Sequence, residues 1–288
     1  MEFVALNFLN GAAFGMLLFL IASGLSLTLG IMGVLNLAHG ALYMVGGYIG
    51  WTVAVQLGLN WGLGVFCGAI GAGLLGLIIE RGLLRHLYGL LNDQVLLTFG
   101  LVYIIKNSCQ WIWGMVPKVP FTAPYLSGSL DIMGQIYPVS RVAVIGIGIV
   151  IAAALWWLID RTRVGAMVRA GMDNSEMTEG LGINVAVVCS AVFCLGAFLA
   201  GAAGVIGADL MGVRAEQSLD IMLYGLIVVV VGGMGSVPGA LIGGLVIGIV
   251  DSFIRGLSPE LGYFSMYMIM AVILLIRPTG ILGRTPKK

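Results

Sequence analysis

Two polar side chains, Asn36 and His39, stand inside a long apolar stretch of the sequence. No Asp, Glu, Lys or Arg occurs between Phe3 and Ile79, so His39 is the side chain there that titrates near neutral pH. An amide and an imidazole can donate and accept hydrogen bonds, so the pair could bind a polar ligand. The imidazole can instead bind a neighbouring carbonyl and tie the local backbone together. Both interpretations of His39 are open from sequence alone.

Glycines surround this polar pair and recur in a second segment. The first segment reads G-I-M-G-V-L-N-L-A-H-G over 30–40, and the second reads G-G-M-G-S-V-P-G over 232–239. Glycine costs about 1 kcal/mol relative to alanine inside a helix, so both segments predict broken helices. Broken backbone at membrane depth is tolerated inside protein or beside a water-filled cavity. We therefore expect hinge or path residues here: Gly33, Asn36, His39, Gly40, Gly232, Gly235 and Ser236.

Composition indicates an integral membrane protein. The chain has 288 residues, of which 60% are hydrophobic and 9% charged, whereas soluble domains carry roughly 25% charged residues. The net charge of +1 gives no basic surface for nucleic acid, and the four cysteines lack metal-site spacing, so no metal or other cofactor is expected. The N-terminus lacks the features of a cleaved signal peptide, which makes the first apolar stretch a permanent span.

The positions of the apolar runs predict an all-α, polytopic fold with eight to nine membrane-crossing or re-entrant helices in one transmembrane domain, 1–288. A spanning helix needs about 20 mostly apolar residues. Asp93 can cap the fourth span, and 115–138 is expected to be a loop. Small residues every fourth position in the third and sixth spans predict close helix packing. The expected spans are 8–30, 36–57, 62–79, 94–113, 139–159, 185–208 and 262–276, with 221–253 as a broken pair.

Basic residues predict the orientation in the membrane. One group of three segments holds nine Lys and Arg residues, including Arg284, Lys287 and Lys288 near the end of the chain. The other segments hold four, which are Lys118, Arg141, Arg214 and Arg255. Because basic loops favour the cytoplasm, the N-terminus is expected outside and the C-terminus inside.

The two glycine-rich segments also echo each other. Gly24–Ala41 and Gly225–Ala240 share G-L, a five-residue apolar stretch, G-x-M-G and a final G-A. Both breaks begin on the side predicted to be cytoplasmic, so the echo predicts a parallel internal repeat. Chance similarity between apolar, glycine-rich runs is the open alternative. Transport sites tend to lie at repeat interfaces and broken helices.

A polar segment at 160–184 is the second informative stretch. Asp173 or Asn174 can cap a short helix that stops near Gly180 or Gly182. Met172, Met177 and Leu181 offer an apolar side, with Glu176 and Glu179 on neighbouring faces. Such a helix between two spans suits a partner protein, although a solvated connector fits equally well.

Other polar residues have ordinary explanations. Asn107 and Gln110 lie on one face of the fourth span and favour hydrogen bonds between helices over substrate binding. Asp251 follows an apolar run, where it is either a functional buried carboxylate or a residue at the outer edge of the span. Loop charges such as Asp131, Asp209 and Glu216 are expected to be solvated, with docking of a partner protein as the alternative.

The stretch G-L-S-L-T-L-G-I-M-G-V-L-N-L-A-H-G-A-L-Y-M-V-G-G-Y, Gly24–Tyr48, resembles the signature of membrane permease subunits of the branched-chain amino acid ABC transporter family. Arg169-Ala170 followed by Leu181-Gly182-Ile183-Asn184 is similar to that family's cytoplasmic coupling loop. The Glu80-Arg81 junction and the break at 232–244 match in kind, so the resemblance runs nearly end to end.

The resemblance implies a transport subunit and not an enzyme. Two related permease subunits, with a heterodimer expected, would form a pore in the bacterial inner membrane that two cytoplasmic ATPases drive and a periplasmic binding protein supplies. Its substrate would be a hydrophobic amino acid, with amides, urea and small carboxylic acids as alternatives. An ion-coupled secondary carrier is the alternative to an ATP-driven importer. The chain has no G-x-x-x-x-G-K-[ST] loop, so ATP would be bound by the partners. The implied ATPase-coupling residues are Arg169, Asp173, Glu176, Met177, Glu179, Leu181 and Gly182.

Overall fold

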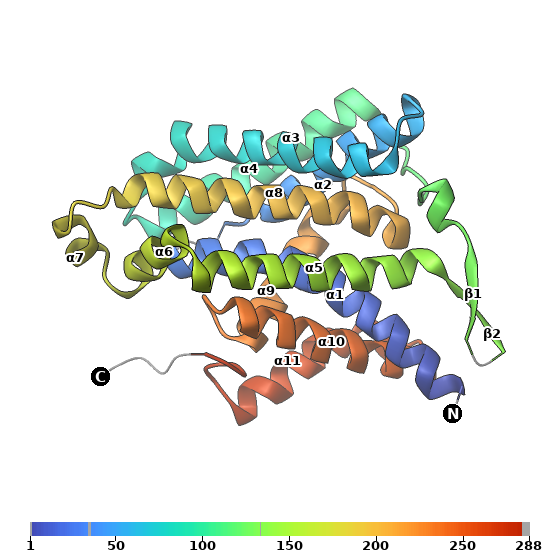
Figure 1. Ribbon diagram of the computed structural model, residues 1–288. Coiled ribbons are helices and arrows are strands. Elements are labelled where there is room, and N and C mark those ends of the chain that lie inside the picture. Colours follow the sequence, from blue (N-terminus) through green and yellow to red (C-terminus); the bar gives the residue numbers. More distant parts are fainter. Residues whose placement is uncertain (1, 34–35, 133, 284–288) are drawn as a thin grey trace.

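The computed structural model describes residues 2–33, 36–132 and 134–283, and its helices run alongside one another in a bundle (Figure 1). Three of the basic residues used to predict the orientation, Arg284, Lys287 and Lys288, lie outside these described residues. Six described helices are long and apolar enough to cross a membrane: α1 (Glu2–Met32), α3 (Trp61–Gly82), α4 (Leu91–Trp113), α5 (Val139–Arg161), α8 (Val185–Met211) and α10 (Val237–Leu257).

Shorter elements complete the bundle. They are α2 (His39–Trp51) with its π-helical continuation η1 (Thr52–Gln56), α6 (Arg163–Asp173), α7 (Ser175–Gly180), α9 (Gln217–Gly232), α11 (Ser265–Ile276), the 3₁₀ turns η2 (Leu84–Leu87), η3 (Pro124–Leu126) and η4 (Leu261–Tyr263), and the strands β1 (Ser129–Ile132) and β2 (Gln135–Pro138). The predicted all-α membrane fold is thus confirmed, while the number of crossings stays a prediction.

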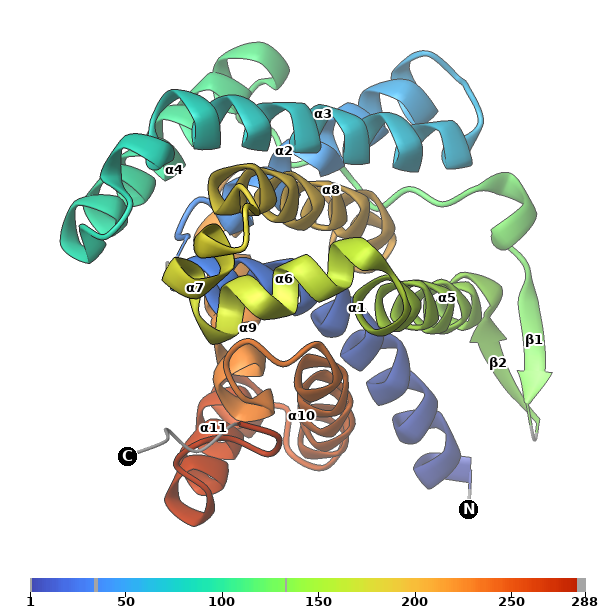
Figure 2. The same cartoon turned by 60° about the vertical axis from the view of Figure 1, so that its left-hand side comes forward.

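The bundle has two distinct ends. We call the end with α6 and α7 the coupling end, and the end with β1 and β2 the hairpin end (Figures 1 and 2). The helix α1 begins at the hairpin end, whereas the segment after α11 lies at the coupling end, where Ile281 and Leu282 pair with the end of α9. The first and the last described residues thus lie at opposite ends of the bundle.

The core of the bundle is built around α1. This helix is apolar on all sides, as expected for one surrounded by other helices, and most of its residues from Gly15 to Thr28 are fully buried. Glycines let α10 approach it closely. A Cβ atom on Gly15 would lie 2.8 Å from the backbone oxygen of Gly244, and one on Gly248 would clash with Gly15 itself. Small residues are therefore required where the two backbones meet.

The predicted small-residue stripes of α3 and α8 each pack against another helix in the core. A Cβ atom on Gly68 in the α3 stripe would lie 2.6 Å from the backbone oxygen of Gly46 in α2, and one on Gly196 in the α8 stripe would lie 2.9 Å from that of Gly24 in α1. The helices α2, α3 and α8 thus form a close-packed group against α1. The prediction that these stripes serve helix packing is confirmed.

Two details differ from expectation at the ends of the spans. The segment 115–138, expected to be a loop, contains an antiparallel hairpin in which Leu130 pairs with Tyr137, and its turn uses Gly134 at a φ of +80°. Asp93 does not cap the fourth span, because α4 already begins at Leu91 and places Asp93 within its first turn. A carboxylate there still interacts favourably with the positive helix N-terminus, three positions after the N-cap residue Leu90.

Candidate functional site

The two glycine breaks meet at the coupling end. A Cβ atom on Gly30, at the end of α1, would lie 2.9 Å from the Cα atom of Gly235, in the link between α9 and α10. The same Cβ would lie 2.6 Å from the terminal methyl carbon of Met172 in α6. We call Gly30, Gly235 and Met172 the glycine junction. It joins both breaks to the segment predicted to be cytoplasmic and to contact an ATPase.

The breaks share a local conformation. Gly33 and Gly235 occupy equivalent positions in the two G-x-M-G sequences, and both have positive φ angles, +63° and +76°. This left-handed region suits glycine and penalises side chains. Each break then contains a side chain that accepts from a nearby backbone amide: the Asn36 side-chain oxygen accepts from the Ala38 amide at 3.0 Å, and the Ser236 hydroxyl accepts from the Gly239 amide at 3.0 Å. These likenesses agree with the predicted repeat.

His39 lies deep within the bundle. Its Nε2 atom is 2.9 Å from the backbone oxygen of Ile21, and the side chain is 1% exposed. Ile21 precedes the end of α1 at Met32 by 11 residues, which is roughly 16 Å at 1.5 Å per residue. The chain thus re-enters the bundle after Met32, and α2 starts beside the middle of α1. The imidazole ties the start of α2 to α1.

Asn36 and Gly40 occupy equally tight positions. Asn36 is 1% exposed, and a Cβ atom on Gly40 would clash with the backbone oxygen of Ser218 in α9. Gly232 approaches Gly239 in the same manner across the second break. In this state of the single chain these residues hold the breaks together, and their role in a translocation path stays a prediction.

A cavity of about 260 Å³ adjoins the glycine junction. Gly235 and Ser236 line it, together with Met172, Arg169 and Leu27. Gly235 and Ser236, both predicted path residues, thus line a cavity together with Arg169 and Met172 of α6. A movement of α6 would therefore change the shape of this cavity directly.

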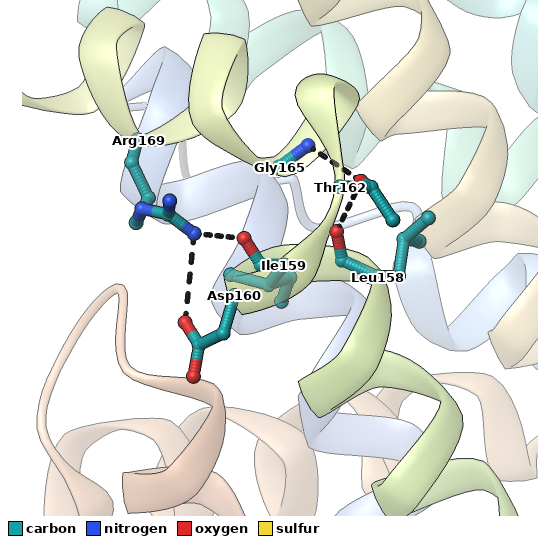
Figure 3. A network of polar contacts seen from close by, with 6 residues as sticks. All are labelled: Leu158, Ile159, Asp160, Thr162, Gly165 and Arg169. Atoms are coloured by element: carbon teal, nitrogen blue, oxygen red, sulfur yellow. Dashed lines mark hydrogen bonds and ion pairs between the residues drawn. The ribbon is translucent and has the colours of Figure 1, made fainter.

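The connection between α5 and α6 is a rigid elbow (Figure 3). Thr162 donates to the backbone oxygen of Leu158 at 2.5 Å and accepts from the Gly165 amide at 3.1 Å. Arg169 donates to the backbone oxygen of Ile159 and lies 3.5 Å from the carboxylate of Asp160 (Figure 3). Arg169, predicted as an ATPase-coupling residue, thus braces this elbow within its own chain.

The helix α7 presents the exposed part of the polar segment 160–184. As predicted, Asn174 caps it by accepting from the Met177 amide at 2.9 Å, and Gly182 follows at a φ of +83°. Met177 and Leu181 are 69% and 76% exposed. The remaining predicted coupling residues in this region are also exposed: Asp173, Glu176, Glu179 and Gly182.

Met172 corrects one part of the sequence interpretation. It was expected to share an apolar side with Met177 and Leu181, but it belongs to the separate helix α6 and lies beside Gly30 and Gly235 instead. The sequence interpretation missed α6 as a helix. Its signal is the spacing of Gly165, Val168 and Gly171, which are the buried residues on one face of the helix.

Comparison with known proteins now decides the family. Residues 7–276 match the family model described as branched-chain amino acid transport system / permease component. The chain belongs to this permease family. No solved structure matches it closely enough to add to that finding.

Curated relatives of this family member span nearly its whole length. It is 30% identical to the high-affinity branched-chain amino acid transport system permease protein LivH of Salmonella typhimurium, over 96% of this chain and 94% of that protein. It is 29% identical to the corresponding protein BraD of Pseudomonas aeruginosa, with the same coverage. The ribose import permease protein RbsC of Escherichia coli is 28% identical over 91% of this chain and 79% of its own length.

Proposed function

We propose that this permease is a subunit of an ATP-driven importer for branched-chain and other hydrophobic amino acids. The glycine junction carries the proposal, because it connects an exposed helix at the coupling end to both broken helices of the bundle. The family supplies the substrate class, since two relatives named above carry out branched-chain amino acid transport. The coupling end is cytoplasmic in this proposal and the N-terminus lies outside.

The partners follow from the same assignment. Two ATPase subunits bind ATP, and one of them receives α7 through Met177 and Leu181. A second, homologous permease subunit completes the pore, and a binding protein delivers the amino acid at the hairpin end. Apolar side chains that are this exposed on a short helix suit a groove on a partner protein.

The mechanism is a mechanical linkage. When the ATPases close, they displace α7 and with it α6, which the elbow at Thr162 joins rigidly to α5. Met172 then moves against Gly30 and Gly235, so that both breaks are shifted together. A rigid lever acting on two hinge segments is one of the established forms of a two-state transition.

Reconstitution tests this proposal. Proteoliposomes with both permease subunits and the ATPases, supplied with ATP inside and binding protein outside, should accumulate labelled leucine. Omitting the ATPases should abolish uptake, and uptake without them would overturn the proposal. Competition by urea, amides or aromatic carboxylates, without competition by valine or isoleucine, would assign one of the alternative substrates.

The proposed ATPase contact on α7 can be tested with a matched control. Replacing Met177→Asp together with Leu181→Asp should abolish co-purification of the ATPase, because charges would enter an apolar contact. The control is Met115→Asp with Val119→Asp, two residues that are 79% and 75% exposed at the opposite end of the molecule. Loss of the ATPase in the control as well, or retention in both, would contradict this role for α7.

A further inference from the structure

A second polar cavity lies at the hairpin end, far from α6 and α7. Its volume is about 480 Å³, and it is bounded by the early turns of α1 and α5, the last turns of α8 and α10, and Tyr224 in α9. This size falls within the range of small-molecule sites, which combine apolar walls with a few placed polar groups. Asn7, Asn10, Arg141, Asp251 and Arg255 supply the polar part, and Phe14, Leu210 and Met211 supply an apolar wall.

Asp251 organises one side of this cavity. Its carboxylate is 3% exposed, lies 2.7 Å from the Arg255 guanidinium and accepts from the Ser265 hydroxyl. The sequence left open whether this acid was buried within the span or lay near its end. It is buried, and it lies in the last two turns of α10. A buried, paired acid in a membrane helix is a mark of function. Here it fixes Arg255, whose side chain is 47% exposed, at the cavity wall.

Arg141 supplies a second cation from the first turn of α5. Its guanidinium donates to the side-chain oxygen of Asn10 in α1. The lining residues include two arginines, Arg141 and Arg255, and one acid, Asp251, so their net charge is +1. Guanidinium groups bind carboxylates with paired, charge-assisted hydrogen bonds. The excess charge therefore favours a ligand that carries a carboxylate.

We infer that this cavity is an entry subsite for the transported amino acid. The α-carboxylate binds Arg141 and Arg255, and the α-ammonium group faces the amide oxygen of Asn7, which lies 3.4 Å from the Ser252 hydroxyl. The apolar side chain lies against Phe14 and its neighbours in the wall. A site of this kind binds weakly enough to release its ligand, because its charged groups are already partly paired with one another.

The position of the cavity supports this inference. A cavity of about 360 Å³, lined by Met16 and Leu241, lies further along the same three helices. The cavity beside the glycine junction continues the row, with Leu27 on α1 and Asp160 on α5. The entry subsite thus stands at the head of a row of cavities that follows α1, α5 and α10 from one end of the molecule to the other. This inference rests on the proposed function.

Labelling tests the subsite in the assembled importer without binding protein. In a chain whose four cysteines are replaced by alanine, a thiol introduced by Ser252→Cys should react severalfold more slowly in the presence of leucine. The analogue 4-methylpentanoate, which lacks the amine, should protect partly, and 3-methylbutylamine, which lacks the carboxylate, should not. Protection by the amine alone, or by none of the three, would overturn the inference.

The variant Arg141→Gln tests the subsite by leucine uptake. Leucine uptake at saturating binding protein should fall by about tenfold, because charge-assisted hydrogen bonds to the carboxylate are lost. Arg214→Gln is the control, since Arg214 is exposed near the same end and does not line the cavity. Unchanged uptake in Arg141→Gln would overturn the subsite, whereas absent uptake in the wild-type importer would overturn the proposed function instead.

A docking role gives a different pattern. If Arg141 served to hold the binding protein, Arg141→Gln would raise the concentration of binding protein that half-maximally stimulates ATP hydrolysis. Leucine would then leave the Ser252→Cys thiol unprotected when the binding protein is absent. That combination would overturn the amino acid subsite and assign the cavity to protein docking.

Discussion

Gly30 and Gly235 touch through their backbones, although 205 positions separate them (235 − 30). A Cβ atom on either glycine would lie about 3 Å from the Cα atom of the other, at 2.9 Å and 3.1 Å. Neither backbone can yield as a flexible side chain would, so the contact permits no added atom. The two broken segments therefore share one surface, and a displacement of one is transmitted to the other.

A methyl group at this contact should separate the breaks. We expect Gly30→Ala to lower the free energy of unfolding by about 1–3 kcal/mol, the usual cost of overpacking, and to reduce uptake. Thermal unfolding in detergent and leucine uptake in proteoliposomes provide the measurements. Gly146→Ala is the control, because a Cβ atom on Gly146 in α5 meets nothing within 4 Å. Equal stability of the two variants would contradict the close contact.

Met172→Ala should uncouple ATP hydrolysis from transport. Removing the thioether separates α6 from both glycines, while Met177 and Leu181 on α7, the proposed ATPase contacts, are unchanged. We expect hydrolysis to persist and leucine uptake per ATP to fall by about tenfold, within the usual range of coupling energies. Met268→Ala, at a half-exposed position of α11, serves as control. A parallel fall in hydrolysis and uptake would point to loss of ATPase binding instead.

His39→Ala distinguishes a structural tie from a path residue. Loss of the hydrogen bond to Ile21, together with the buried ring, should destabilise the chain by about 2 kcal/mol. His86→Ala is the matched control, because His86 is exposed at the coupling end. Unchanged stability combined with altered substrate selectivity would instead favour a place for His39 in the path.

Tyr88→Phe tests a buried acid at the coupling end. Glu80 in the last turn of α3 is 0% exposed, and the Tyr88 hydroxyl donates to its carboxylate at 2.5 Å. Burial and the neighbouring Glu80 raise the pKa of Tyr88 further above its usual value, so the hydroxyl keeps its proton at every physiological pH. Its removal should destabilise the chain by about 2 kcal/mol.

The control for that variant is Tyr125→Phe, at a residue that is 62% exposed in the hairpin-end loop. Unfolding temperatures of the two variants and the wild type give the comparison. A Tyr88→Phe chain that unfolds at the wild-type temperature would show that Glu80 finds another donor.

The glycine breaks and the helix α7 could be predicted from sequence because their signals are local. Gly33 and Gly235 need left-handed backbone, and Asn174 caps the helix that starts at the next residue. In both cases a residue type and its immediate neighbours determine the structure.

Contacts between distant segments could not be predicted in this way. Nothing near Met172 in the sequence indicates that it faces Gly30, because that contact depends on how α6 folds back under α1. The cluster of Arg141 and Asp251 has the same origin, since α5 and α10 meet at one end of the bundle only in three dimensions. The charges of both residues were visible, but their shared cavity was not.

The final described residues complete the end of α9. The Ile281 and Leu282 amides donate to the backbone oxygens of Val231 and Gly232 at 2.8 Å and 3.0 Å. These donors come 50 residues after their acceptors (281 − 231), so a ribosome must synthesise α10 and α11 before those carbonyls are satisfied. During membrane insertion the second break is therefore assembled late, and a chain truncated before this stretch would leave two bare acceptors in the finished bundle.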